Sequence, residues 1–169
     1  IEEELGRSQR AYDQMSVNLP AAVGAGALLS VVMAGAWAGV TIATDRMFVL
    51  LALGIGFVVA FGVRMAAGKG GLPVQIIGGV FTLASVIMGN AMFSLYFLKE
   101  QLLLEGMEMS YADMLPFVPE LLISEPSDLI FAVFAGLAGA YYAHKAGAAD
   151  DLTQAIDRAD GRSRMAAAS

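Results

Sequence analysis

Residues 72–98 read LPVQIIGGVFTLASVIMGNAMFSLYFL, an apolar stretch without a charged side chain. A transmembrane helix needs about 20 predominantly apolar residues to cross a hydrocarbon core about 30 Å thick. Apolar stretches at residues 20–44 and 47–65 are also long enough, and a fourth at residues 129–144 is at the short end of that range. The sequence therefore predicts an all-α fold, a polytopic membrane protein built as a four-transmembrane-helix bundle.

Basic residues are distributed unequally between the two ends of these stretches. Only two of the ten Lys and Arg residues, Arg46 and Lys99, follow the first or third stretch directly. The other eight lie before the first stretch, between the second and third, or at and after the end of the fourth: Arg7, Arg10, Arg64, Lys69, Lys145, Arg158, Arg162 and Arg164. Because cytoplasmic loops of membrane proteins carry an excess of Lys and Arg, this bias predicts that both termini are cytoplasmic.

Three further segments complete the predicted organisation around the four-span membrane domain at residues 20–145. Residues 1–19 are predicted to form a cytoplasmic juxtamembrane helix, and residues 146–169 a cytoplasmic tail with one short helix. The external segment at residues 99–128 is acidic, yet it is rich in Leu, Met and Phe. We expect it to extend the third span and then form a short helix at the outer interface, either as a lipid-facing flap or as a docking surface.

Composition excludes several classes of function. Hydrophobic residues make up 57% of the 169 residues and charged residues 15%, which is typical of a polytopic membrane protein. Without Cys and with a single His, disulfides, thiolate metal sites, Fe–S clusters and bis-His haem are not expected. The net charge of −6 argues against nucleic acid as a partner. No catalytic residue, cofactor or metal site is predicted, and the chain is not expected to be an enzyme.

Small residues at four-residue spacing are the dominant local pattern in the apolar stretches. In lipid, helices associate where small residues let their backbones approach closely. The predicted helix-packing residues are Gly35, Gly39, Gly56, Gly136 and Gly139. Two rows of small residues in the last stretch leave open whether it packs only within the chain or also against another chain. Deep in the third stretch, Asn90 is predicted to make a hydrogen bond between helices, and Trp37 to fill space against neighbouring glycines.

Five residues near the predicted cytoplasmic surface are expected to anchor the bundle at the headgroups. Tyr at this depth is typical of the interfacial belt, and long basic side chains extend from helix ends towards the headgroups. The predicted anchors are Arg64, Lys69, Tyr141, Tyr142 and His144.

Two stretches of the chain resemble an uncharacterised family of bacterial four-span membrane proteins. The first, residues 62–90, contains the Gly68-Lys69-Gly70 turn, and the second, residues 126–145, begins with the pattern Pro-x-Asp-Leu. The sequence departs from the family at Ala132, where an aromatic residue is expected. The resemblance implies a membrane anchor behind a variable N-terminal module in the bacterial inner membrane, and it brings no activity with it.

The sequence leaves three classes of function open. A non-catalytic accessory or scaffold subunit, packed against other membrane chains or as a homo-oligomer in the lipid bilayer, is the leading hypothesis. A small oligomeric channel or carrier is the first alternative, although Thr82, Ser85 and Asn90 do not share one face of a helix. An intramembrane enzyme acting on lipid or quinone is the second alternative, and its carboxylates would have to come from the external segment.

Overall fold

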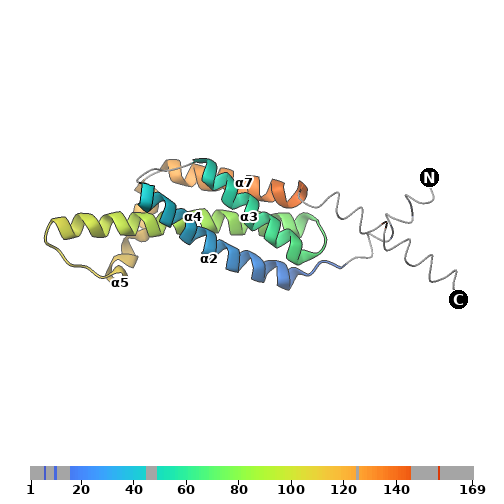
Figure 1. Cartoon of the computed structure of the whole chain (residues 1–169), viewed down its shortest axis with the longest axis horizontal. Coiled ribbons are helices and arrows are strands. Elements are labelled where there is room, and N and C mark those ends of the chain that lie inside the picture. The colour runs from blue at the N-terminus through green and yellow to red at the C-terminus, as the bar shows by residue number, and fades with distance from the viewer. Residues whose placement is uncertain are drawn as a thin grey trace.

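The computed structural model describes residues 6, 10, 16–44, 49–124, 126–145 and 156. Four long helices dominate this part of the chain: α2 (Leu19–Thr44), α3 (Val49–Ala67), α4 (Leu72–Leu104) and α7 (Pro126–Lys145) (Figure 1). Helix and turn account for almost all of the described residues, which include no strand, and the all-α prediction is confirmed. The predicted helices at residues 1–19 and 146–169 lie almost wholly outside the described residues.

Three of the helices are long and apolar enough to cross a membrane. They are α2, the Leu50–Ala67 part of α3, and α4, which together place the chain among membrane proteins. The observed bounds of α2 and α3 lie within two residues of the predicted spans. Helix α7 has an apolar part, Leu129–Lys145, that is shorter than these three.

The four helices form one elongated bundle in which α2 and α4 run in the same direction and α3 and α7 run in the opposite one (Figure 1). A tight turn joins α3 to α4. In this turn Gly68 has a backbone φ of 72°, a value that residues other than glycine rarely adopt. At the same end of the bundle, the Asn18 N–H donates a hydrogen bond of 3.0 Å to the Ala67 carbonyl. The start of α2 is thereby attached to the end of α3.

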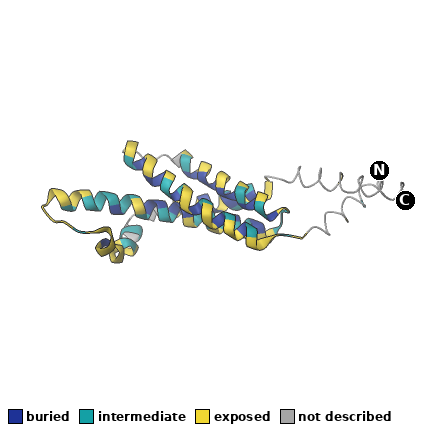
Figure 2. Cartoon of the chain, turned by 60° about the horizontal axis from the view of Figure 1, so that its bottom comes forward, coloured by how far each residue is buried: buried dark blue, intermediate teal, exposed yellow. Residues whose placement is uncertain are grey.

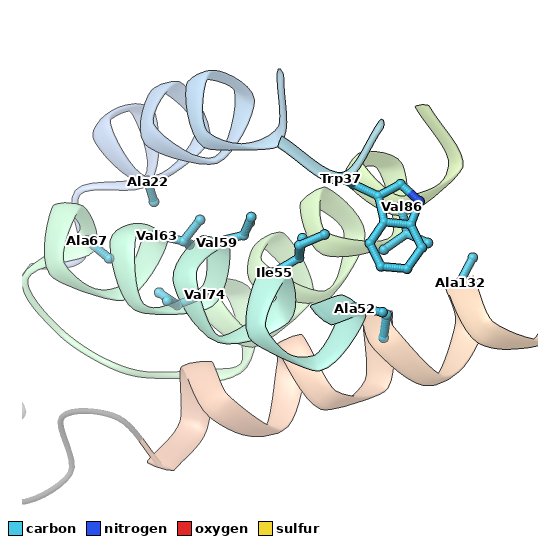
Figure 3. Close-up of a cluster of buried hydrophobic side chains, with 11 residues drawn as sticks. Ala22, Trp37, Ala52, Ile55, Val59, Val63, Ala67, Val74, Val86 and Ala132 are labelled. Atoms are coloured by element: carbon cyan, nitrogen blue, oxygen red, sulfur yellow. The ribbon is translucent and has the colours of Figure 1, made fainter. Parts of the chain in front are cut away.

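The interior of the bundle is built mostly from small side chains and its exterior from large ones. Figure 2 shows that the buried residues line the sides of the helices that face one another. The buried cluster in Figure 3 is mostly Ala and Val, with Ile55 and Trp37 as its larger members. Large apolar side chains instead point outward: Leu28 is 67% exposed, Leu50 81% and Phe134 63%. A soluble protein would bury such side chains, whereas lipid solvates them as well as a protein interior does.

Helix α4 extends to Leu104, six residues beyond the predicted end of the third span. The chain then returns along α4 through α5 (Tyr111–Met114), the 3₁₀ helix η1 (Leu115–Phe117) and α6 (Val118–Ser124), which contacts both α4 and α7. The predicted external segment is therefore partly a continuation of α4. The short outer helix expected there is present as these three consecutive pieces, because Pro116 and Pro119 interrupt a continuous helix.

Candidate functional site

Helices α4 and α7 approach each other so closely at two facing glycines that a methyl group on either one would be in tight contact with the other helix. A Cβ atom placed on Gly79 would lie 3.0 Å from the Gly136 carbonyl oxygen and 3.2 Å from the Ala140 Cβ. A Cβ atom on Gly136 would in turn lie 3.2 Å from the Gly79 carbonyl oxygen. Contacts this short leave the two helices little freedom to accept a side chain here.

Helix α3 packs against both α4 and α7 close to this contact. A Cβ atom on Gly56 would lie 3.3 Å from both the Ala135 carbonyl oxygen and the Thr82 Cγ2 atom. One on Gly139 would collide with the Thr82 hydroxyl and lie 3.2 Å from the Gly78 carbonyl oxygen. The structure thus brings three of the predicted packing residues, Gly56, Gly136 and Gly139, together at the junction of α3, α4 and α7.

The junction also explains the two rows of small residues on α7. In one row, Gly136 faces Gly79 and Leu83 of α4. In the other, Gly139 faces Gly78 and Thr82 of α4, and Gly56 of α3 lies against Ala135 and Gly139. Both rows are therefore occupied by helices of the same chain. Gly78 and Gly79 were not among the predicted packing residues, although two adjacent glycines inside an apolar stretch were a signal that the sequence offered.

The two other predicted packing residues lie elsewhere. A Cβ atom on Gly35 or Gly39 would meet no heavy atom of the described residues within 4 Å. Gly39 is exposed, as are Ala36 and Val40 beside it. This outer face of α2 takes no part in the packing of the described chain, although its sequence spacing is the same as that of the buried glycines.

Polar side chains connect α2 to α4 in the middle of the bundle. The Ser30 Oγ atom lies 2.7 Å from the Gly26 carbonyl oxygen and 2.9 Å from that of Phe81, and its hydrogen is shared between them. The Ser85 hydroxyl donates a bond of 3.0 Å to the Ser30 carbonyl. A Cβ atom on Gly26 would overlap the Phe81 ring, so these hydrogen bonds again occur where glycine permits close approach.

The Asn90 side chain makes the hydrogen bond between helices that the sequence predicted. The Trp37 Nε1–H donates to Asn90 Oδ1 over 2.8 Å, and both residues are buried, with exposures of 5% and 4%. The indole lies against Gly89, where a Cβ atom would be only 2.6 Å from the Trp37 Cδ1 atom. Trp37 thus fills the space opposite a glycine, as expected, and its single polar atom is satisfied by the adjacent Asn90.

The predicted headgroup anchors cluster at the end of the bundle that carries the Gly68 turn. Tyr141 and His144 are exposed and Tyr142 is half-buried, with its ring edge-on to Phe57 at a centroid distance of 5.6 Å. The Gln75 Nε2 atom lies 2.9 Å from His144 Nδ1 and connects the start of α4 to the end of α7. Lys69, in the turn itself, is half-buried.

Arg64 requires a correction, because its side chain does not extend into solvent as predicted for an anchor. It is only 5% exposed and has an interaction partner within the chain. Arg64 lies one turn before Ala67, where the chain entering α2 crosses the end of α3. A sequence pattern that places an arginine at the end of a span does not reveal whether its side chain is buried in the tertiary structure.

Among the described residues, no group of three or more His, Asp or Glu side chains is placed to hold a metal ion. Comparison with protein-family models, with curated proteins and with solved structures finds no match to this chain. The features that define the candidate site are therefore the helix contacts themselves, namely the glycine junction and the α2–α4 hydrogen bonds, together with the unoccupied outer face of α2.

We predict that Gly139→Val destabilises the bundle by about 1–3 kcal/mol or more, the range for overpacking a close contact. The added side chain would meet Thr82 and the Gly78 carbonyl and push α7 away from α4. The measurement is thermal unfolding of the purified protein in a mild detergent. Gly54→Val is the matched control, because Gly54 is an exposed helical glycine with open space around it; equal loss in both variants would contradict the prediction.

We predict that Trp37→Phe and Asn90→Leu each destabilise the protein and that their effects are not additive. The hydrogen bond between the two side chains should account for about 0.6–1.7 kcal/mol of coupling, the range for such bonds in membrane proteins. The measurement is a double-mutant cycle on the free energy of unfolding. Because Trp37 is the only Trp in the chain, its emission spectrum reports separately on the environment of the pair; additive effects would contradict the prediction.

Proposed function

We propose that this protein is a non-catalytic integral membrane subunit, an accessory or scaffold protein that packs against other membrane chains. The observation that supports this most directly is the outer face of α2, where Gly35 and Gly39 are separated by one helical turn and meet no described neighbour. In lipid, such a face permits the close approach of a further helix.

The proposal includes a placement of the chain in the membrane. Helix α7, with 20 residues, is about 30 Å long and packs along α4, so we assign it as the fourth span. The excess of basic residues at the Gly68 end supports cytoplasmic termini. The resemblance to a bacterial four-span family supports a location in the bacterial inner membrane.

The buried polar groups favour this function over a channel. The Thr82 hydroxyl donates to the Gly78 carbonyl over 2.8 Å, and Ser30, Ser85 and Asn90 are likewise hydrogen-bonded within the bundle. The bonds of Ser30, Ser85 and Asn90 join α2 to α4 and that of Thr82 lies within α4, so these groups are used inside the bundle instead of lining a water-filled path. The carboxylates whose side chains the structure describes lie between residues 100 and 120, in the segment beyond the predicted third span, which also makes an intramembrane acid–base site a weaker hypothesis.

The placement predicts which engineered cysteines a membrane-impermeant thiol reagent reaches from each side. The natural chain has no Cys, so single substitutions label without background. In inner-membrane vesicles of known orientation, Lys69→Cys and Lys145→Cys should react from the cytoplasmic side and Glu108→Cys from the opposite side. Labelling of Lys69→Cys and Lys145→Cys from opposite sides would show that α7 does not span.

The packing proposal predicts that Gly39→Ile removes partner chains while leaving the protein itself folded. The isoleucine would project from α2 into a space that holds no described atom, so the bundle should retain its thermal stability. The bound helix, however, would lose its close contact. The measurement is the mass of the complex extracted from native membranes in mild detergent, and we expect the variant to run as the single chain.

Gly54→Ile is the matched control, since Gly54 is an exposed glycine on α3 that also has open space around it. It should leave the mass of the complex unchanged. If the wild-type protein itself runs as a single chain, or if Gly39→Ile retains every partner, the proposed function is wrong.

A further inference from the structure

Helix α4 extends well past the other helices of the bundle. Gly136 faces Gly79, and α7 begins ten residues before Gly136, at Pro126. Because α7 runs antiparallel to α4, ten residues before Gly136 on α7 correspond to ten residues after Gly79 on α4. The start of α7 is therefore level with about residue 90 of α4. The remainder of α4, to Leu104, therefore continues for about 20 Å beyond α7. Figure 1 shows this end of α4 standing clear of α2, α3 and α7.

We name residues 93–122 the outer lobe, and the lobe is a folded structure. Met114 is fully buried, and Lys99 Nζ lies 4.2 Å from the centre of the Tyr111 ring. The Ser110 hydroxyl accepts from the Asp113 N–H at 3.3 Å and donates to the Asp113 carboxylate at 2.7 Å, which caps α5. A surface held in this way is ordered before any partner arrives, so little conformational entropy is lost on binding.

Large apolar side chains are exposed on the outer lobe. Leu104 is 89% exposed, Leu115 59% and Leu103 49%, and Met107 and Phe117 are exposed nearby. Leu103 and Leu104 are the last two residues of α4, and Met107 follows them, so all three are well beyond the start of α7. Exposed apolar side chains gathered outside the lipid are typical of a surface that binds another protein.

The outer lobe also carries five carboxylates. They are Glu100, Glu105, Glu108, Asp113 and Glu120. Lys99, the one basic residue of the lobe, is held over the Tyr111 ring. The exposed leucines are therefore surrounded by negative charge, and this charge determines which occupant fits.

We propose that the outer lobe is a docking surface for a basic protein segment, one that presents apolar side chains between Lys or Arg residues. Its apolar groups would cover Leu103 and Leu104, and its cations would pair with Glu105 and Glu108. Such a segment is preferred over a second copy of the lobe, since two acidic lobes repel each other. It is also preferred over the bilayer surface, because anionic headgroups are repelled and the tip lies too far from the hydrocarbon.

The inference rests on the proposed membrane placement but uses a different surface from the α2 face. The test uses the full chain in nanodiscs of zwitterionic phosphatidylcholine. The probe is a fluorescent synthetic amphipathic helix with Leu on one face and Lys on the other. Binding is measured by fluorescence anisotropy against empty nanodiscs. A peptide with Glu in place of Lys is the control for non-specific apolar binding.

We expect Leu104→Ser to weaken binding about tenfold, since one exposed leucine is buried on docking. The double variant Glu105→Gln, Glu108→Gln should weaken it and reduce its dependence on salt. All three side chains are exposed, so the lobe should remain folded in both variants. Lys145→Gln, at the opposite end of the bundle, should bind as the wild type does.

Three results would overturn the docking surface. They are binding to the protein no tighter than to empty nanodiscs, equal binding of the Glu-containing peptide, and wild-type binding by Leu104→Ser and by the double variant Glu105→Gln, Glu108→Gln. Cross-linking between the lobes of two chains would instead assign the surface to self-association, which also overturns it. Gly39→Ile should bind the peptide normally, so that failure of lateral packing and failure of the outer lobe are distinguished.

Discussion

The close approach of α4 to α3 and α7 at glycine is the constraint on which the rest of the structure depends. At Gly79 and Gly136 the backbones lie near enough that a methyl group would press against a carbonyl oxygen. Dispersion forces and short polar contacts hold helices together in lipid, and both fall off steeply with distance. The glycine junction keeps α7 within range of its neighbours.

This constraint fixes where side chains of each size and polarity can go. Small residues are used inside, so the large ones must face outward, where lipid accommodates Leu50 and Phe134 without penalty. Hydroxyl groups such as those of Ser30 and Ser85 reach carbonyls on the facing helix only because the helices are close. Trp37 is the exception in size, and Gly89 provides the space it occupies.

The two parts of α4 differ in exposure because only one of them is packed on several sides. The part before about residue 90 contacts α2, α3 and α7 and forms the centre of the bundle. The part beyond it continues to Leu104 and exposes Leu103 and Leu104 at its end. The surfaces left over, the α2 face and the outer lobe, lie in different solvents. Glycines on the first suit a helix in lipid, and carboxylates on the second suit a basic partner in water.

The sequence by itself determined the helices, because hydrophobicity and helix-breaking residues are local properties: the bounds of α2 and α3 were predicted within two residues. It also showed that Asn90 needs a polar partner, but the partner, Trp37, lies 53 residues away and only the tertiary structure selects it. Gly39 and Gly136 each belong to a row of small residues at four-residue spacing, yet Gly39 faces outward and Gly136 faces the carbonyl of Gly79. Arg64 was misjudged for the same reason. Which face of a helix is covered depends on the neighbours it meets, and no local pattern contains that information.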